Sequence, residues 1–264
     1  MKIAALIKHV PVSNDVSVDP DTHALIRANS EGMINPADLN AIEAALILKE
    51  QTGGQVTVFT MGPPDAEKSL RNAIAMGCDD SCLITDRCFA GGDTIATAKV
   101  LAAGIKHYGE FDLILGGALS SDGATGQVGA MVSEYLQIPH ISEIHQVDYE
   151  EEAVDKLKAI KKYQGNQFCL QTSLPALLTV CFGANIPRLA TLRTKRAAKS
   201  KPLAVYTNED LKFPPHETGL AGSPTEVIDS FEPESKKKAK FISGTPEEAA
   251  REIKALIQKE EGRD

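Results

Sequence analysis

The chain has 264 residues, a formal net charge of −8 and five cysteines. Its length suffices for one substantial α/β core with an extension, and the acidic balance argues against sequence-independent binding of nucleic acid, which needs excess lysine and arginine. No apolar run reaches the roughly 18 residues of a membrane span, and the N-terminal residues turn polar too early for a signal peptide. Irregularly spaced cysteines are typical of reduced thiols. We therefore expect a cytoplasmic protein that has no metal site and binds neither nucleic acid nor membranes.

Strand, loop and helix alternate four times in the first half of the chain. The apolar run 3–7 predicts a buried central strand, and the polar stretch 11–32 predicts a long irregular excursion with a small hairpin at 16–18 and 24–26. The elements predicted after it are helix 35–49, strand 55–60, helix 65–76, strand 81–85, helix 94–105, strand 113–115 and helix 128–136. Because crossovers between parallel strands are right-handed, we predict a doubly wound, mostly parallel, Rossmann-like α/β sheet.

The first predicted helix has clear start signals. Asn35 can act as N-cap, Pro36 suits the first helical position, and Asp38 favours the first turn. The loops that follow parallel strands emerge at one edge of a sheet, where ligands of open α/β sheets bind. We therefore expect this helix start and the loops after the strands to line one crevice.

The segment 112–129 has the order strand, polar glycine loop, helix. That order directs free backbone N–H groups and the positive end of a helix dipole to one point beyond the strand, where a phosphate fits. The loop lacks both the Walker A and the GxGxxG pattern. From this segment alone, phosphate binding and plain capping of the helix by Asp122 or Thr125 both remain open.

The pattern changes after Pro139. Alternating polar and apolar residues predict strands at 141–149, 154–163, 168–170 and 176–180, some of them antiparallel, which extend the sheet. Residues 212–240 are too rich in Pro, Gly, Ser and charge to hold a core, and a final helix at 245–259 has a narrow apolar stripe that suggests docking. We therefore divide the chain into a nucleotide-binding α/β domain, 1–181, and an extended C-terminal arm, 182–264.

Several motifs together resemble the beta subunit family of electron transfer flavoproteins, and the resemblance runs nearly end to end. The segments that carry it are Lys8 after the first strand, Asn35-Pro36 before a helix with Glu43, Met61-Gly62-Pro63, the run 70–79, the loop 122–127 and the run 187–192. The resemblance implies a heterodimer with an alpha subunit that carries the electron-transferring flavin. It also implies that the crevice of this chain holds a nucleotide, which is AMP in conventional members and a second FAD in electron-bifurcating members.

The resemblance implies nucleotide contacts at Leu6, Asn35, Pro36, Ala37, Asp38, Met61, Ser120, Ser121, Asp122, Gly123, Ala124, Thr125, Gly126, Gln127, Val128, Gly129 and Ala130. In bifurcating members the FAD takes a hydride from NADH and sends its electrons along two routes, to ferredoxin and, through the alpha-subunit FAD, to an acyl-CoA dehydrogenase-type partner. No catalytic side chain is expected in this chain. The protein's own share is to tune the cofactors.

The choice between FAD and AMP depends on residues 91–97. They resemble the G-x-D-T-x-A-T element of bifurcating members, so we expect Asp93, Thr94 and Thr97 at the flavin. Thr94 and Thr97 are one helical turn apart, which allows both hydroxyls to reach the same flavin edge. The alternative is that Asp93 and Thr94 only cap the helix and Thr97 is incidental.

The turn at Ala190-Thr191-Leu192 resembles the family's docking loop, in which a leucine anchors the subunit to a partner dehydrogenase. We expect Leu192, with Arg188 beside it, to form an apolar anchor with a polar rim. A different class of function, a stand-alone nucleotide-binding module, would predict a stable monomer that keeps its ligand. The arm after residue 182 favours a chain that binds partners instead.

Overall fold

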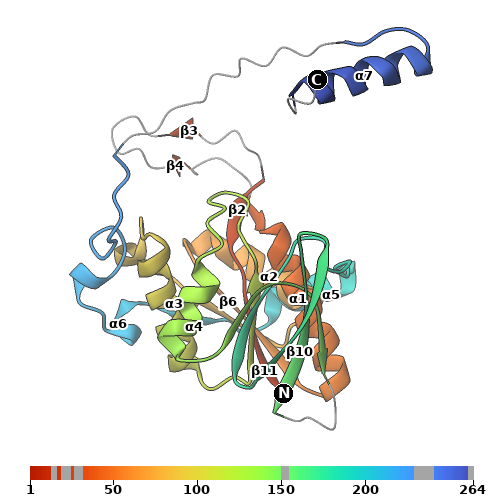
Figure 1. Ribbon diagram of the computed structural model, residues 1–264. Coiled ribbons are helices and arrows are strands. Elements are labelled where there is room, and N and C mark those ends of the chain that lie inside the picture. The colour runs from red at the N-terminus through yellow and green to blue at the C-terminus, as the bar shows by residue number, and fades with distance from the viewer. Residues whose placement is uncertain (13–16, 19–24, 27–31, 150–154, 229–240, 261–264) are drawn as a thin grey trace. The chain divides into compact units, whose positions relative to one another are not determined.

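The computed structural model describes residues 1–12, 17–18, 25–26, 32–149, 155–228 and 241–260. The described residues before residue 229 include a central nine-stranded sheet, covered by helices (Figure 1). The strand order is β11-β10-β9-β12-β8-β1-β6-β7-β13. The strands are β1 (Lys2–Leu6), β6 (Gln55–Met61), β7 (Asp80–Ile84), β8 (Leu113–Gly117), β9 (His140–Tyr149), β10 (Lys156–Tyr163), β11 (Asn166–Ser173), β12 (Ala176–Val180) and β13 (Ala204–Tyr206). In the run β9-β12-β8-β1-β6-β7-β13, every strand pairs in parallel with its neighbours in that run. At the other end of the sheet, β10 pairs antiparallel with both β9 and β11. The predicted mostly parallel sheet with an antiparallel extension is confirmed.

Helices cover both faces of the sheet, as a doubly wound fold requires. Side chains alternate across a strand, so Ile3 and Ala5 of β1 pack in one core cluster and Ala4 and Leu6 in another. The first cluster contains residues of α1 (Pro36–Thr52) and α2 (Glu67–Met76), and the second contains residues of α3 (Thr94–Tyr108) and α4 (Val128–Leu136). Since both faces are buried, the parallel strands have nearly continuous apolar sequences.

The excursion between β1 and α1 contains short antiparallel pairs. β2 (His9–Pro11) pairs with β5 (Gly32–Ile34), and β3 (Ser17–Val18) pairs with β4 (Leu25–Ile26). The second pair confirms the predicted hairpin where it is described, and its turn, 19–24, lies outside the described residues. The sequence predicts a helix from residue 65, but a 3-10 turn, η1 (Pro64–Ala66), comes first and α2 begins at Glu67.

Part of the predicted arm belongs to the sheet. β13 pairs with β7, and α5 (Leu192–Ser200) packs on α2. The remaining short elements are η2 (Arg87–Phe89), α6 (Asn208–Leu211) and η3 (Pro215–Glu217). The chain divides into a compact unit Met1–Ile228 and a second unit Asp229–Asp264.

Of the second unit, the structure describes residues 241–260, which include α7 (Pro246–Glu260). This confirms the predicted terminal helix. In its apolar stripe, the side chains of Ile253, Leu256 and Ile257 are exposed within the described part of this unit. The predicted docking of the helix stays a prediction. Among the described residues, no helix is long and apolar enough to cross a membrane.

Candidate functional site

A cavity of about 1000 Å³ opens at the carboxyl ends of β1, β6, β7 and β8. Ligand pockets of small molecules and cofactors cover about 300–1000 Å³, so this cavity is large enough for a dinucleotide. The residues that we predict from the sequence and that line it are Leu6, Asn35, Asp38, Met61, Asp93, Thr94, Thr97, Ser120, Gly123, Thr125, Gly126, Gln127, Val128 and Gly129. The other predicted contacts, which lie beside these in the chain, stay predictions: Pro36, Ala37, Ser121, Asp122, Ala124 and Ala130.

Asn35 joins the start of α1 to the loop after β8. It is the N-cap residue, but its side chain makes no capping bond to the helix. Its Nδ2 donates to Asp38 Oδ1 and to the carbonyl oxygen of Leu119, both at 3.0 Å, and its Oδ1 accepts from the Ser121 N–H at 3.0 Å. The predicted side-chain cap is therefore wrong, because the amide instead satisfies backbone groups of the neighbouring loop.

Asp38 is a buried carboxyl group at the point where three elements meet. Its Oδ2 accepts from the Lys8 N–H at 2.6 Å, after β1, and its Oδ1 accepts from the Gly117 N–H at 3.0 Å, at the end of β8. Gly117 is required here, since a Cβ at that position would lie 2.1 Å from Asp38 Oδ1. Burial raises the pKa of Asp38 to about 7, although the hydrogen bonds from Asn35, Lys8 and Gly117 and the Lys8 charge lower it.

Lys8 provides a cation at the cavity wall. Its Nζ lies 2.7 Å from Asp122 Oδ1 and 3.4 Å from Ser120 Oγ. Burial raises the pKa of Asp122, but the hydrogen bonds from Lys8 and Ser120 and the Lys8 charge outweigh it and lower the pKa overall. The loop after β8 is therefore held in place by an ion pair as well as by Asn35.

The loop between β8 and α4 leaves the start of α4 open. Neither Asp122 nor Thr125 caps this helix, because its N-cap, Gln127, has no side-chain capping bond and Asp122 Oδ1 accepts from Lys8 and from the Gly123 N–H. The capping alternative is thus wrong. Gly126 has a positive φ of 63°, which favours glycine. Uncapped N–H groups at a helix start that borders a cavity are suited to an anionic ligand.

The start of α3 also borders the cavity, beside the start of α4. Asp93 caps this helix, since its Oδ1 accepts from the Ile95 and Ala96 N–H groups at 3.0 Å. Its Oδ2 accepts from the Thr225 hydroxyl at 2.8 Å. Thr94 Oγ1 donates to Gln127 Oε1 at 3.1 Å, across to the start of α4. The capping role of Asp93 is therefore confirmed, and Thr94 and Thr97 border the cavity.

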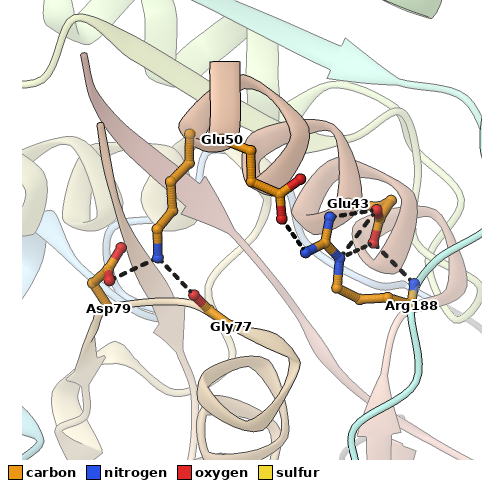
Figure 2. Close-up of polar contacts among 6 residues, drawn as sticks. Glu43, Glu50, Gly77, Asp79 and Arg188 are labelled. Carbon is orange, nitrogen blue, oxygen red and sulfur yellow. Dashed lines mark hydrogen bonds and ion pairs between the residues drawn. The ribbon is translucent and has the colours of Figure 1, made fainter. Parts of the chain in front are cut away.

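A segment with exposed leucines follows β12, and Figure 2 shows how it is fixed to α1. Leu189 is 92% exposed and Leu192 is 81% exposed. In the sequence, Arg188 lies after β12 and before these leucines. It donates from Nε and Nη2 to the carboxylate of Glu43, and its backbone N–H donates to Glu43 Oε2 at 2.9 Å. Its Nη1 donates to Glu50 Oε1 at 2.5 Å. Arg188 thus holds the segment on α1, and its predicted role in a docking rim stays a prediction.

A family model for the electron transfer flavoprotein domain matches residues 22–211. The chain belongs to the electron transfer flavoprotein family. It is 38% identical to the electron transfer flavoprotein subunit beta of Thermoanaerobacterium thermosaccharolyticum, over 96% of both chains. It is 38% identical to subunit CarD of the caffeyl-CoA reductase-Etf complex of Acetobacterium woodii, over 93% of both chains. It is also 38% identical to the acryloyl-CoA reductase electron transfer subunit gamma of Anaerotignum propionicum, over 98% of this chain and 99% of that one.

Sequence reasoning missed several residues at the cavity of this electron transfer flavoprotein chain. Those with polar or charged side chains include Lys8, Asp86, Arg87, Thr179 and Thr207. Lys8 had a usable signal, because it lies two residues after the central strand, β1. The others come from three parts of the chain that only the fold brings together: the segment after β7 with Asp86 and Arg87, strand β12 with Thr179, and the segment after β13 with Thr207. Among the described residues, no group of three or more His, Cys, Asp or Glu side chains is arranged to hold a metal ion.

Proposed function

We propose that this beta subunit of an electron transfer flavoprotein binds FAD in the cavity at the strand ends and takes electrons from NADH. One electron then goes to ferredoxin and the other, through the FAD of the alpha subunit, to an acyl-CoA dehydrogenase or reductase partner. We place this complex in the cytoplasm. The observation that carries the proposal is the cavity of about 1000 Å³, which reaches from Asn35 and Ser120 to Thr94 and Thr97.

The chemistry of the wall supports an adenine nucleotide as ligand. One end combines the uncapped start of α4, the glycine-containing loop after β8 and the cation of Lys8. Backbone N–H groups at a helix start and a nearby ammonium group are suited to a phosphate. These residues would hold and orient the phosphates, together with the loop that Asn35 fixes.

The extent of the cavity supports FAD over AMP. AMP would need only part of a space at the upper end of the range for cofactor pockets, whereas the ring of a dinucleotide can extend toward α3. FAD would supply the hydride and single-electron chemistry. Thr94 and Thr97 would orient the ring edge by hydrogen bonds. The Asp93 carboxylate already caps α3 and accepts a hydrogen bond from Thr225. We therefore propose that Asp93 supports the position of Thr94.

The alternative with structural AMP is favoured by one observation. The Thr94 hydroxyl already donates to Gln127 Oε1 at 3.1 Å, so its proton is satisfied without a flavin. A bound ring would have to use the oxygen of Thr94 as an acceptor or displace Gln127.

The names of two relatives support an acyl-CoA reducing partner, since one belongs to a caffeyl-CoA reductase complex and the other to an acryloyl-CoA reductase. We propose that Leu192 docks on such a partner and that Arg188 positions the segment that presents it. Leu192 is 81% exposed, as an apolar anchor must be before it binds.

The deciding experiment is cofactor release from the chain purified with its alpha subunit. Two FAD and no AMP per heterodimer are expected. One FAD with one AMP would replace the proposal by the conventional redox-carrier function. In a Thr94→Ala, Thr97→Ala variant, the redox behaviour of the flavin in this chain and the rate of NADH oxidation should both change, and no change in either would contradict the assigned roles.

A further inference from the structure

A segment late in the chain, residues 218–225, is fastened to the loop that leads from η2 to α3. We call this segment the strap. The Leu220 backbone N–H donates to the carbonyl oxygen of Ala90 at 3.0 Å, and the Thr218 hydroxyl donates to that of Cys88 at 3.3 Å. The Thr218 side chain is buried. The strap therefore packs closely along the loop that enters α3.

Gly219 allows the strap to approach this loop. Its φ is 57°, in the left-handed region that favours glycine. A Cβ at this position would lie 2.2 Å from the carbonyl oxygen of Cys88 and 2.7 Å from that of Ala90. Directly before the strap, Glu217 forms an ion pair with Lys99 of α3. Backbone packing and charge thus fix the strap at the start of α3.

Asp93 is held by the strap through both its backbone and its side chain. Its N–H donates to Ser223 Oγ at 2.9 Å, and the Ser223 hydroxyl donates onward to the carbonyl oxygen of Gly219 at 2.7 Å. Asp93 Oδ2 accepts from the Thr225 hydroxyl at 2.8 Å and from the Thr225 N–H at 3.3 Å. Because the other oxygen, Oδ1, already caps α3, the contacts with the strap serve a purpose other than capping.

The strap fixes a wall of the cavity from behind. Thr94 and Thr97 border the cavity, whereas the residues of the strap, all of which are described, lie outside its lining. Thr94 directly follows Asp93, and the Thr97 N–H donates to the Asp93 carbonyl oxygen at 2.9 Å. A displacement of Asp93 would therefore move both threonines.

We propose that Ser223 and Thr225 are positioning residues of the flavin site, which hold Asp93 and thereby fix where the Thr94 and Thr97 hydroxyls meet the flavin ring. The inference rests on the proposed FAD function and deepens it, since neither Ser223 nor Thr225 lines the cavity.

The direction of the expected effect follows from the Thr94 hydroxyl. Its proton is donated to Gln127 Oε1, so its oxygen is available to the ring as an acceptor. Reduction adds N–H groups to a flavin ring, and an acceptor held at the ring edge therefore favours the reduced flavin. Loosening the strap should lower the midpoint potential of the flavin in this chain.

The test is Thr225→Val, which removes the hydroxyl of an exposed side chain and retains its shape. In the heterodimer with the alpha subunit, FAD should stay bound, and the preference of this site for reduced over oxidised FAD should fall by about three- to tenfold, as for the loss of one hydrogen bond. A tenfold fall lowers the midpoint potential of a two-electron couple by about 30 mV. Spectroelectrochemical titration measures this shift. The Thr94→Ala, Thr97→Ala variant identifies which of the two flavins belongs to this chain.

Two further variants are the controls. Thr225→Ser restores the hydroxyl and should restore the potential. Thr52→Val removes a hydroxyl that donates to the carbonyl oxygen of Leu48 within α1, and it should leave the potential unchanged. Added to the Thr94→Ala, Thr97→Ala variant, Thr225→Val should cause no further shift, because the strap acts through these two threonines.

An unchanged potential in Thr225→Val would overturn the inference, and so would a shift of full size when both Thr94 and Thr97 are absent. Should Thr225→Val not fold, Ser223→Ala takes its place, since it frees the Asp93 N–H from the strap and should lower the potential in the same way. A heterodimer that contains AMP in place of the second FAD would instead refute the proposed function.

Discussion

The contact between Arg188 and Glu43 is the place where a single substitution should separate the docking segment from the core. Arg188→Ala removes the guanidinium group that pairs with the Glu43 carboxylate. The Glu43 side chain is only 9% exposed. Of the hydrogen bonds between these two residues, only the one from the backbone N–H of residue 188 would remain. The two residues are 145 positions apart, so the contact fixes a distant segment on α1 (Figure 2).

The cost can be estimated from burial. Removing one partner of a fully buried ion pair costs about 3–5 kcal/mol, whereas an exposed pair contributes about 0–1 kcal/mol. The Arg188 side chain is 34% exposed and Glu50 is 61% exposed. We therefore expect a loss of about 2–4 kcal/mol, nearly all of it from Glu43, which lowers the melting temperature by about 5–10 °C in a chain of this size.

The assay is chemical denaturation of the unmodified chain, Arg188→Ala, Glu43→Gln and the double variant. The double variant should be less destabilised than the two single effects together, by about 1–3 kcal/mol, because the single variants leave a buried group unpaired. Arg193→Ala is the control, since Arg193 is exposed on the adjoining helix, and it should change stability by no more than about 0.5 kcal/mol. A loss below about 0.5 kcal/mol in Arg188→Ala, with additive effects in the double variant, would refute this reasoning.

Three further substitutions test other parts of the structure. Gly117→Ala should destabilise the protein by about 1–3 kcal/mol or more and weaken nucleotide binding, because its Cβ would lie 2.1 Å from Asp38 Oδ1; unchanged denaturation and binding curves would contradict this. Burial raises the folded-state pKa of Asp38 from its ordinary value to about 7, so its stabilising contribution is complete below about pH 4 and is lost as the pH rises through 7, by at most about 4 kcal/mol. Denaturation at pH 5 and pH 8 should show this loss, and Asp38→Asn should reduce it. Leu192→Ala should leave stability within about 0.5 kcal/mol yet weaken binding to the partner dehydrogenase, and equal binding would remove Leu192 from the interface.

Local patterns were sufficient to predict the parallel core. Four repeats of strand and helix could be predicted from the apolar runs of β1, β6, β7 and β8 and from the glycines that end several helices. Right-handed crossovers then place the loops that can bind a ligand at one edge of the sheet. For this reason most of the predicted contacts, from Leu6 to Gly129, do border the cavity.

The polar contacts could not be predicted in the same way, since they join residues far apart in the sequence. Asn35 fits the pattern of an N-cap, but its amide bonds to the loop at Leu119 and Ser121, because that loop has backbone groups to satisfy. Arg188 fits a docking rim by its position beside Leu192, but Glu43 binds it. β13 was missed because it is only three residues long and follows a polar stretch.

The most direct test of the account is an experimental structure of the chain with its nucleotide bound. We predict that the phosphates lie between Lys8 and the start of α4, against residues 120–126, and that a flavin ring extends to Thr94 and Thr97. A nucleotide bound away from the strand ends, or a phosphate at the α3 side of the cavity, would contradict it.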